Sequence, residues 1–209
     1  AALTPLDILC EPGVGAAIAA QVAARGGLMG AFVYRNEGLR AKLEQVFALA
    51  QQHGLALDFH VDEGLDVDAT ALADIADLTM AFGMQGRVVC GHACSLSVQD
   101  AAQAQATLAR CAQAGLHLVA LPTTNLYLQG AWAATPVERG ITRVLEARAA
   151  GVSLSLATDN VQDAFYPYGN YDLLATWSLG VQVAHLAPAL DWLDTITTAP
   201  AAALGLAWD

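Results

Sequence analysis

An apolar, strand-like stretch of the chain ends at His60 and runs directly into Asp62 and Glu63. A buried strand ordinarily ends in turn residues, because several ionisable groups together are costly to desolvate. Two further apolar stretches end in the same way, one at His92 and one at Asp159. Histidine and aspartate are ligands of Zn²⁺ and Fe²⁺. Strand ends that carry His, His and Asp therefore predict a metal-dependent active site on a parallel barrel.

We assign a different role in such a site to each of His60, Glu63, His92 and Asp159. We predict His60 and Asp159 as metal ligands, because a catalytic metal needs protein ligands and an open position for water. Glu63 is placed to move a proton to a leaving group, and His92 to hydrogen-bond a developing oxyanion. Each residue alone has a structural alternative, such as a hydrogen-bonded histidine or a simple turn at Asp159. The conjunction of three strand ends favours the catalytic interpretation.

Strand-like and helix-like stretches alternate along the chain, and this order predicts a parallel sheet. Polar residues follow several different strands, which favours a (β/α)₈ barrel over a doubly wound sheet with a single switch point. Helices are expected at residues 16–24, 39–53, 69–82, 97–114, 137–150, 171–184 and 189–204, with a polar excursion at 123–136. The expected strands are residues 6–11, 28–33, 55–60, 87–92, 116–122 and 152–158.

The composition fits one large α/β domain, and we treat residues 1–209 as a single catalytic-barrel portion. Hydrophobic residues make up 56% and charged residues 14% of the 209 residues, as expected for a sheet covered on both faces. The net charge of −11 and the nine scattered Lys and Arg residues argue against nucleic acid and membrane partners. The four cysteines form no CxxC pair and predict buried thiols in a reducing cytoplasm.

A glycine-rich turn at Gly13 and Gly15 approximates the GxGxxG fingerprint of dinucleotide-binding proteins, with Ile18 in place of the third glycine. The fingerprint also needs an acidic residue at the end of the next strand, and residues 28–34 supply none. A turn that packs closely is therefore the better explanation of these glycines.

The chain resembles the cytosine deaminase branch of the metal-dependent amidohydrolase superfamily over nearly all of its length. Seven short motifs carry the resemblance, and together they are far more specific than any one alone. They are FALA at 47–50, HVDE at 60–63, GH at 91–92, NLYLQG at 125–130, RGITRV at 139–144, DNV at 159–161 and FYPYG at 165–169.

The resemblance implies a role for each matching residue. His60 resembles a metal-ligand histidine, and Glu63 resembles the glutamate that shuttles protons. His92 looks like the histidine that orients the attacking water, and Asp159 like a metal-bound aspartate that accepts a proton from it. Two substrate-binding residues follow: Asn160, where cytosine deaminases have a second aspartate, and Phe165, where the family places an aromatic ring against the substrate.

What the resemblance implies as a whole is a metal-dependent hydrolytic deaminase that acts on cytosine-like or other amino-substituted nitrogen heterocycles. One divalent metal ion, zinc or iron, and a homo-oligomer are expected. The alternatives are an amidohydrolase that acts on another C–N bond, such as an N-alkylamino triazine or a cyclic amide, and a non-catalytic barrel remnant that serves as a binding module.

The sequence departs from the family at its beginning. The His-x-His pair of the family's first strand occurs nowhere in the chain, and neither do the first two strands or the small β-sandwich. We therefore expect an incomplete (β/α)₈ barrel of the amidohydrolase kind that holds strands three to eight.

Overall fold

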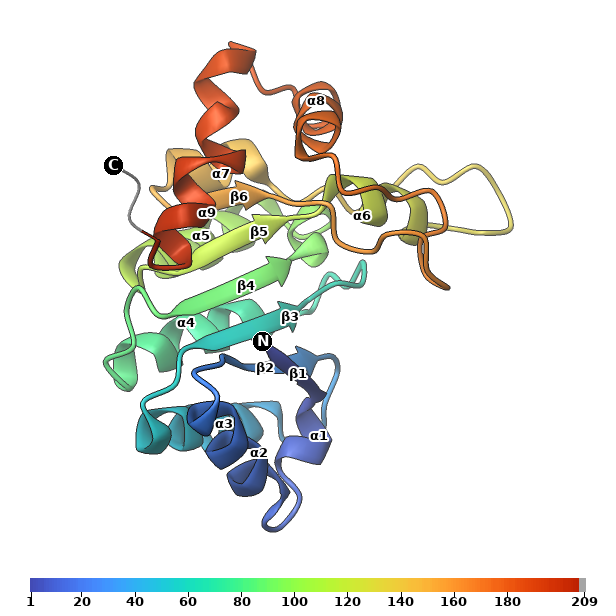
Figure 1. The fold of residues 1–209 in the computed structure, drawn as a ribbon. Helices are drawn as coiled ribbons and strands as arrows, with labels where there is room; N and C mark the ends of the chain where they lie inside the picture. Colours follow the sequence, from blue (N-terminus) through green and yellow to red (C-terminus); the bar gives the residue numbers. More distant parts are fainter. Residues whose placement is uncertain (207–209) are drawn as a thin grey trace.

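The computed structural model describes residues 1–206, in which six parallel strands form one sheet in sequential order (Figure 1). Helices follow the strands, and in the first half of the chain each helix packs beside the next. The predicted parallel βα architecture is thus confirmed. The strands are β1 (Ala2–Pro5), β2 (Met29–Val33), β3 (Leu57–Val61), β4 (Val88–His92), β5 (His117–Ala120) and β6 (Ser153–Leu156).

Nine α-helices and two 3₁₀ helices are found among residues 1–206. The 3₁₀ helices are η1 (Cys94–Ser97) and η2 (Ala189–Ile196). The α-helices are α1 (Leu6–Leu9), α2 (Val14–Ala24), α3 (Leu39–His53), α4 (Ala71–Ala81), α5 (Ala101–Gln113), α6 (Pro122–Leu128), α7 (Val144–Ala149), α8 (Leu173–Val183) and α9 (Thr198–Ala203).

Alternation along β3 shows how the sheet separates its core from its functional face. Leu57 and Phe59 are completely buried, and Phe59 stacks on Phe47 of α3 with ring centroids 5.9 Å apart. Asp58 and His60, on the other face of the strand, are only half-buried. Because side chains alternate along a strand, the helices cover one face and the polar residues line the other.

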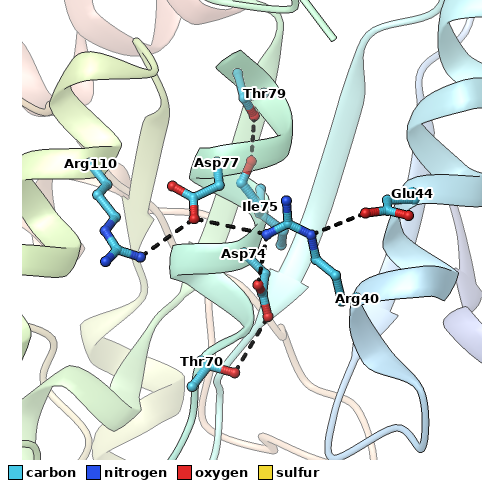
Figure 2. A network of polar contacts seen from close by, with 8 residues as sticks. All are labelled: Arg40, Glu44, Thr70, Asp74, Ile75, Asp77, Thr79 and Arg110. Atoms are coloured by element: carbon cyan, nitrogen blue, oxygen red, sulfur yellow. Dashed lines mark hydrogen bonds and ion pairs between the residues drawn. The ribbon is translucent and has the colours of Figure 1, made fainter. Parts of the chain in front are cut away.

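An ion-pair network links the outer surfaces of three neighbouring helices (Figure 2). Arg40 of α3 contacts Glu44 in its own helix at 3.3 Å and Asp74 of α4 at 3.0 Å. Asp77 of α4 lies 3.8 Å from Arg40 and 3.5 Å from Arg110 of α5. Exposed pairs of this kind contribute about 0–1 kcal/mol each.

Several expected elements differ from the structure. The helix expected at 137–150 is only α7, and the helix expected at 189–204 is the 3₁₀ helix η2 followed by α9. Residues 6–11 were predicted as a strand, but the strand is β1 and Leu6 begins α1. Leu6 and Leu9 are both buried, and their i,i+3 spacing places them on one side of a helical turn. The polar excursion predicted at 123–136 likewise begins with a helix, α6, whose first residue is Pro122. Proline is well suited to that position, because its missing N–H has no helical partner there.

Close packing accounts for Gly15, in the glycine-rich turn. A Cβ at this position would lie 2.2 Å from the carbonyl oxygen of Leu9, so any larger residue would push α2 away from α1. All four cysteines are free thiols, as their spacing predicted. Within residues 1–206, no helix is long and apolar enough to cross a membrane.

His117, at the start of β5, makes a buried polar contact between two strands. Its Nδ1 lies 2.8 Å from the Ser153 hydroxyl and its Nε2 lies 2.7 Å from the Ser155 hydroxyl, both on β6. Burial lowers the pKa of His117 from 6.5 to about 4. The ring is therefore neutral in the folded protein at neutral pH.

We expect this histidine to make the stability of the fold depend on pH. Between about pH 6.5 and pH 4 the unfolded chain binds a proton that folded His117 does not bind. Its contribution is thus complete above pH 6.5 and falls by up to about 3 kcal/mol as the pH drops to 4. His117→Gln, which stays neutral, should reduce the difference in unfolding free energy between pH 7 and 4.5, measured in urea. An equal difference in both proteins would contradict the assignment.

Candidate active site

The carboxyl ends of β3 and β4 bring His60, Glu63 and His92 together. The two histidine rings lie side by side, with His92 Nε2 3.1 Å from His60 Nδ1, and Glu63 Oε1 is 3.8 Å from His92 Nδ1. One ligand atom from each residue lies within 4.8 Å of the others, so this group could hold a metal ion. Three of the residues predicted from the sequence are therefore neighbours in space.

Left-handed backbone conformations occur where these strands end. The φ angles of Asp62, His92 and Asp159 are +49°, +73° and +61°. Such angles are costly for residues other than glycine and persist where surrounding structure holds them, often at active sites. For His92 the consequence is direct. In a regular strand His92 would point to the same face as Cys90, which is buried under the helices. Its left-handed backbone instead turns the ring against His60.

Asn125 of α6 fixes the orientation of His92. Its Oδ1 lies 3.2 Å from His92 Nδ1, whereas the Glu63 carboxylate lies 3.8 Å from the same nitrogen, beyond hydrogen-bond distance. The Asn125 acceptor favours a proton on Nδ1, which leaves the lone pair of Nε2 directed towards His60. Asn125 is almost completely buried. In the sequence Asn125 belongs to the NLYLQG motif, and the signal that points to it is a polar amide shortly after a predicted strand.

His60 is held in its neutral form by its surroundings. Burial lowers its pKa, and the neighbouring His92 lowers it further, while Asp58, Asp159 and Glu63 oppose the shift. The ring packs edge-on against Phe32 of β2, with centroids 4.9 Å apart. Neutral imidazole is the form that binds metal ions, so the environment suits a ligand.

Asp159 enters from β6, at the far side of the same edge of the sheet. The hydroxyls of Thr123 and Thr124 on α6 donate to the carbonyl of Thr158, at 2.8 and 3.3 Å, and so anchor the end of the strand. Asp159 Oδ2 is buried and has no hydrogen-bond partner among the described residues. An unpartnered buried carboxylate oxygen is costly. It therefore fits a cation, although Asp159 is not part of the His60–Glu63–His92 group.

Asp62, which the sequence analysis left without a role, holds the start of α4. Its Oδ2 accepts the backbone N–H of Leu72 at 3.0 Å, and burial raises its pKa to about 6. Ser95, which follows β4, also contacts the connection between β3 and α4. Its N–H donates to the Asp62 carbonyl at 3.0 Å and its hydroxyl to the Gly64 carbonyl at 2.6 Å. Glu63 lies between these two anchored residues.

The RGITRV motif at residues 139–144 also acts through backbone contacts. The Thr142 hydroxyl donates to the carbonyl of Ala93 at 2.9 Å, next to His92. Arg143 donates to the carbonyls of Leu96 and Gln99 at 2.7 and 2.9 Å. The motif therefore supports the segment that follows β4.

The two predicted substrate-binding residues lie in the connection between β6 and α8. Asn160 is half-buried and directly follows Asp159, while Phe165 is 64% exposed. A cavity of about 600 Å³ opens beside Glu63, between the connections that follow β2 and β3, and Tyr34 and Arg35 line it. The substrate-binding roles of Asn160 and Phe165 and the proton-transfer role of Glu63 stay predictions.

The chain belongs to the amidohydrolase family, whose model matches residues 15–207. It is 39% identical over 206 residues to a pterin deaminase of Rhizobium rhizogenes, an alignment that covers 98% of this chain and 47% of that protein. The chain thus spans about half the length of this curated relative.

Solved structures support the same family. A 5-methylcytosine deaminase from Klebsiella pneumoniae, liganded with phosphonocytosine, is 27% identical with a TM-score of 0.85, covering 97% of this chain and 52% of that one. An N-isopropylammelide isopropylaminohydrolase from Burkholderia multivorans is 29% identical with a TM-score of 0.78, covering 97% and 50%. The predicted fold class, a partial barrel of the amidohydrolase kind, is confirmed, and the chain covers about half the length of each of these neighbours.

We expect Asp62→Ala to lower the free energy of unfolding by about 1–2 kcal/mol, because the first turn of α4 loses a buried acceptor. Asp68→Ala, a change of the same type at an exposed position on the same connection, is the control and should stay within about 0.5 kcal/mol of wild type. Urea unfolding at pH 7 measures both. Equal stability of the two variants would show that the Asp62 carboxylate does not hold the helix.

Proposed function

We propose that the protein is a metal-dependent hydrolytic deaminase of amino-substituted nitrogen heterocycles. The observation that carries the proposal is the grouping of His60, Glu63 and His92 within 4.8 Å at the strand ends. Two relatives support the substrate class, since one is a pterin deaminase and another is a 5-methylcytosine deaminase. Both names describe removal of an amino group from a nitrogen heterocycle.

The proposed cofactor is one divalent metal ion, zinc or iron. His60 and Asp159 are the proposed protein ligands, and the neutral ring of His60 and the unpartnered Oδ2 of Asp159 fit that role. His92 and Glu63 lie close enough to His60 to serve as further metal ligands or to contact a substrate next to the metal. When bound, such a metal acts as a Lewis acid that lets water ionise near neutral pH.

The chain's own residues can move the protons that deamination requires. Water adds to the amino-bearing ring carbon, and Asp159 accepts one of its protons. Glu63 delivers a proton to the ring nitrogen, and the proton held by Asp159 goes to the amino group as the C–N bond breaks. The new hydroxyl group then returns its proton to Glu63 as the carbonyl forms. The Nε2 lone pair of His92 can accept a hydrogen bond from the new hydroxyl group. The products are ammonia and the ring with a carbonyl in place of the amino group.

A second candidate is hydrolysis of another C–N bond. The N-isopropylammelide isopropylaminohydrolase structure favours it, because its name describes removal of an alkylamine from a related kind of ring. The third candidate, a non-catalytic binding module, predicts that no metal binds tightly and that changes at Glu63 have no measurable effect.

The proposal extends to the setting of the protein. We place it in the cytoplasm, where the four free thiols would stay reduced. Its partner is a small heterocyclic substrate, with no nucleic acid or membrane partner, and it assembles as a homo-oligomer. Residues 1–209 serve as one catalytic-barrel portion.

Ammonia release by the intact protein tests the function directly. We expect release from at least one of pterin, cytosine and isocytosine, whereas isopropylamine release from N-isopropylammelide would favour the second candidate. Glu63→Gln should lower kcat by about 10²- to 10⁴-fold, because it removes the proton carrier without changing the shape of the side chain.

The matched control is Glu37→Gln, an exposed glutamate on the connection after β2, which should leave kcat unchanged. An unaffected kcat in Glu63→Gln would contradict the proposed proton transfer.

Activity tests the support that Asn125 gives to His92. We expect Asn125→Ala to lower kcat by about 10- to 100-fold, because partners that orient a histidine of the site typically contribute that much. Ammonia release at saturating substrate measures kcat. Asn36→Ala, a surface change, is the control. A wild-type kcat in Asn125→Ala would rule out this orienting role.

A further inference from the structure

Asp163 is an exposed carboxylate in the connection after β6, between the two predicted substrate-binding residues, and its contacts are unusually complete. Its Oδ1 accepts the backbone N–H groups of Phe165 and Tyr166, at 2.9 and 2.8 Å. Its Oδ2 accepts from the side-chain Nδ2 of Asn160 at 2.6 Å. One side chain thus holds both residues that the sequence predicted to contact the substrate.

These bonds also fix which way the amide of Asn160 faces. A carboxylate only accepts hydrogen bonds, so the nitrogen of Asn160 must face Asp163 and its oxygen must face away. The same contacts lower the pKa of Asp163, which is therefore a carboxylate at neutral pH. An aspartate at position 160 would instead set two negative charges against each other.

The connection that Asp163 organises is closely folded on itself. A Cβ at Gly169 would lie 2.2 Å from the carbonyl oxygen of Asn160 and 2.9 Å from the Cα of Val161, so the chain returns to within contact of its own beginning. Near the start of the connection Asp159 has a left-handed backbone, three residues after the end of β6. Its shape is therefore defined at both ends.

Aromatic packing joins this connection to the helix that orients His92. The Tyr127 ring on α6 lies 5.3 Å from the Tyr166 ring and 5.5 Å from the Tyr168 ring, measured between centroids. Tyr127 is two residues from Asn125 in the same helix. The connection is thus packed against an element that already belongs to the candidate site.

We propose that Asp163 is a positioning residue that folds residues 160–169 so that the Asn160 amide oxygen and the Phe165 ring are presented to a planar heterocycle. The proposal rests on the proposed function. It assigns to the substrate an N–H donor near Asn160, because a fixed amide oxygen is an acceptor. Asp163 itself contacts no reacting atom and acts through the two residues it holds.

Amide hydrogen exchange tests the fold of the connection without any need for activity. Asp163→Ala should speed exchange at Phe165 and Tyr166 at least tenfold. Asp163→Asn, which keeps an acceptor oxygen for these amides, should exchange at nearly the wild-type rate. Asp191→Ala, an exposed change outside the connection, is the control. Unchanged exchange in Asp163→Ala would overturn the proposal.

Kinetics on the heterocycle that the intact protein turns over test the positioning role. Asp163→Ala should raise KM at least tenfold while kcat stays within about threefold of wild type. Asn160→Asp should also raise KM, and the double variant Asn160→Asp with Asp163→Asn should recover part of the loss, because the donor and acceptor are exchanged. A merely structural role would lower the amount of folded enzyme, and so the apparent kcat, without raising KM.

The two proposals fail in different ways. If wild type releases neither ammonia nor an alkylamine, the proposed function fails, and exchange alone decides whether Asp163 holds the connection. If wild type is active and Asp163→Ala loosens the connection without any change in KM, the positioning role is wrong.

Discussion

The parallel register of the sheet is the constraint on which the candidate site depends. Neighbouring strands pair in the same direction, so His60 on β3 and His92 on β4 reach the same edge although 32 residues separate them. The helices cover the face of the sheet opposite to His60, and there Phe59 packs on Phe47. Because the strands cannot shift against one another without exposing that core, the polar residues at their ends hold fixed positions.

The site is completed by contacts between connections rather than by the strands alone. Ser95 holds the connection that carries Glu63, Asn125 orients His92, and Thr123 anchors the end of β6 next to Asp159. Each contact joins segments distant in sequence. Most use a backbone carbonyl or N–H group as one partner, so they fix the path of the chain as well as the side chain. This explains how left-handed residues can persist at the strand ends.

Much of the fold followed from the sequence because its patterns are local. The helix at residues 39–53 was expected from apolar spacing and from Gly54, which ends it in a left-handed conformation. The strands β2 to β6 were also found within about two residues of their expected bounds. The first strand was misplaced because Leu6 and Leu9 fit either a short buried strand or a single helical turn, and only packing distinguishes the two.

The sequence by itself determined the βα order, the parallel sheet and which strands end in ionisable residues, since periodicity and residue type are local properties. It also marked His60, Glu63, His92 and Asp159 as candidates. Only the tertiary structure decided which of them are neighbours, that Asp62 holds a helix, and that Asn125 faces His92. Those results depend on hydrogen bonds between segments about 10 and 33 residues apart, which have no periodic signal in the chain.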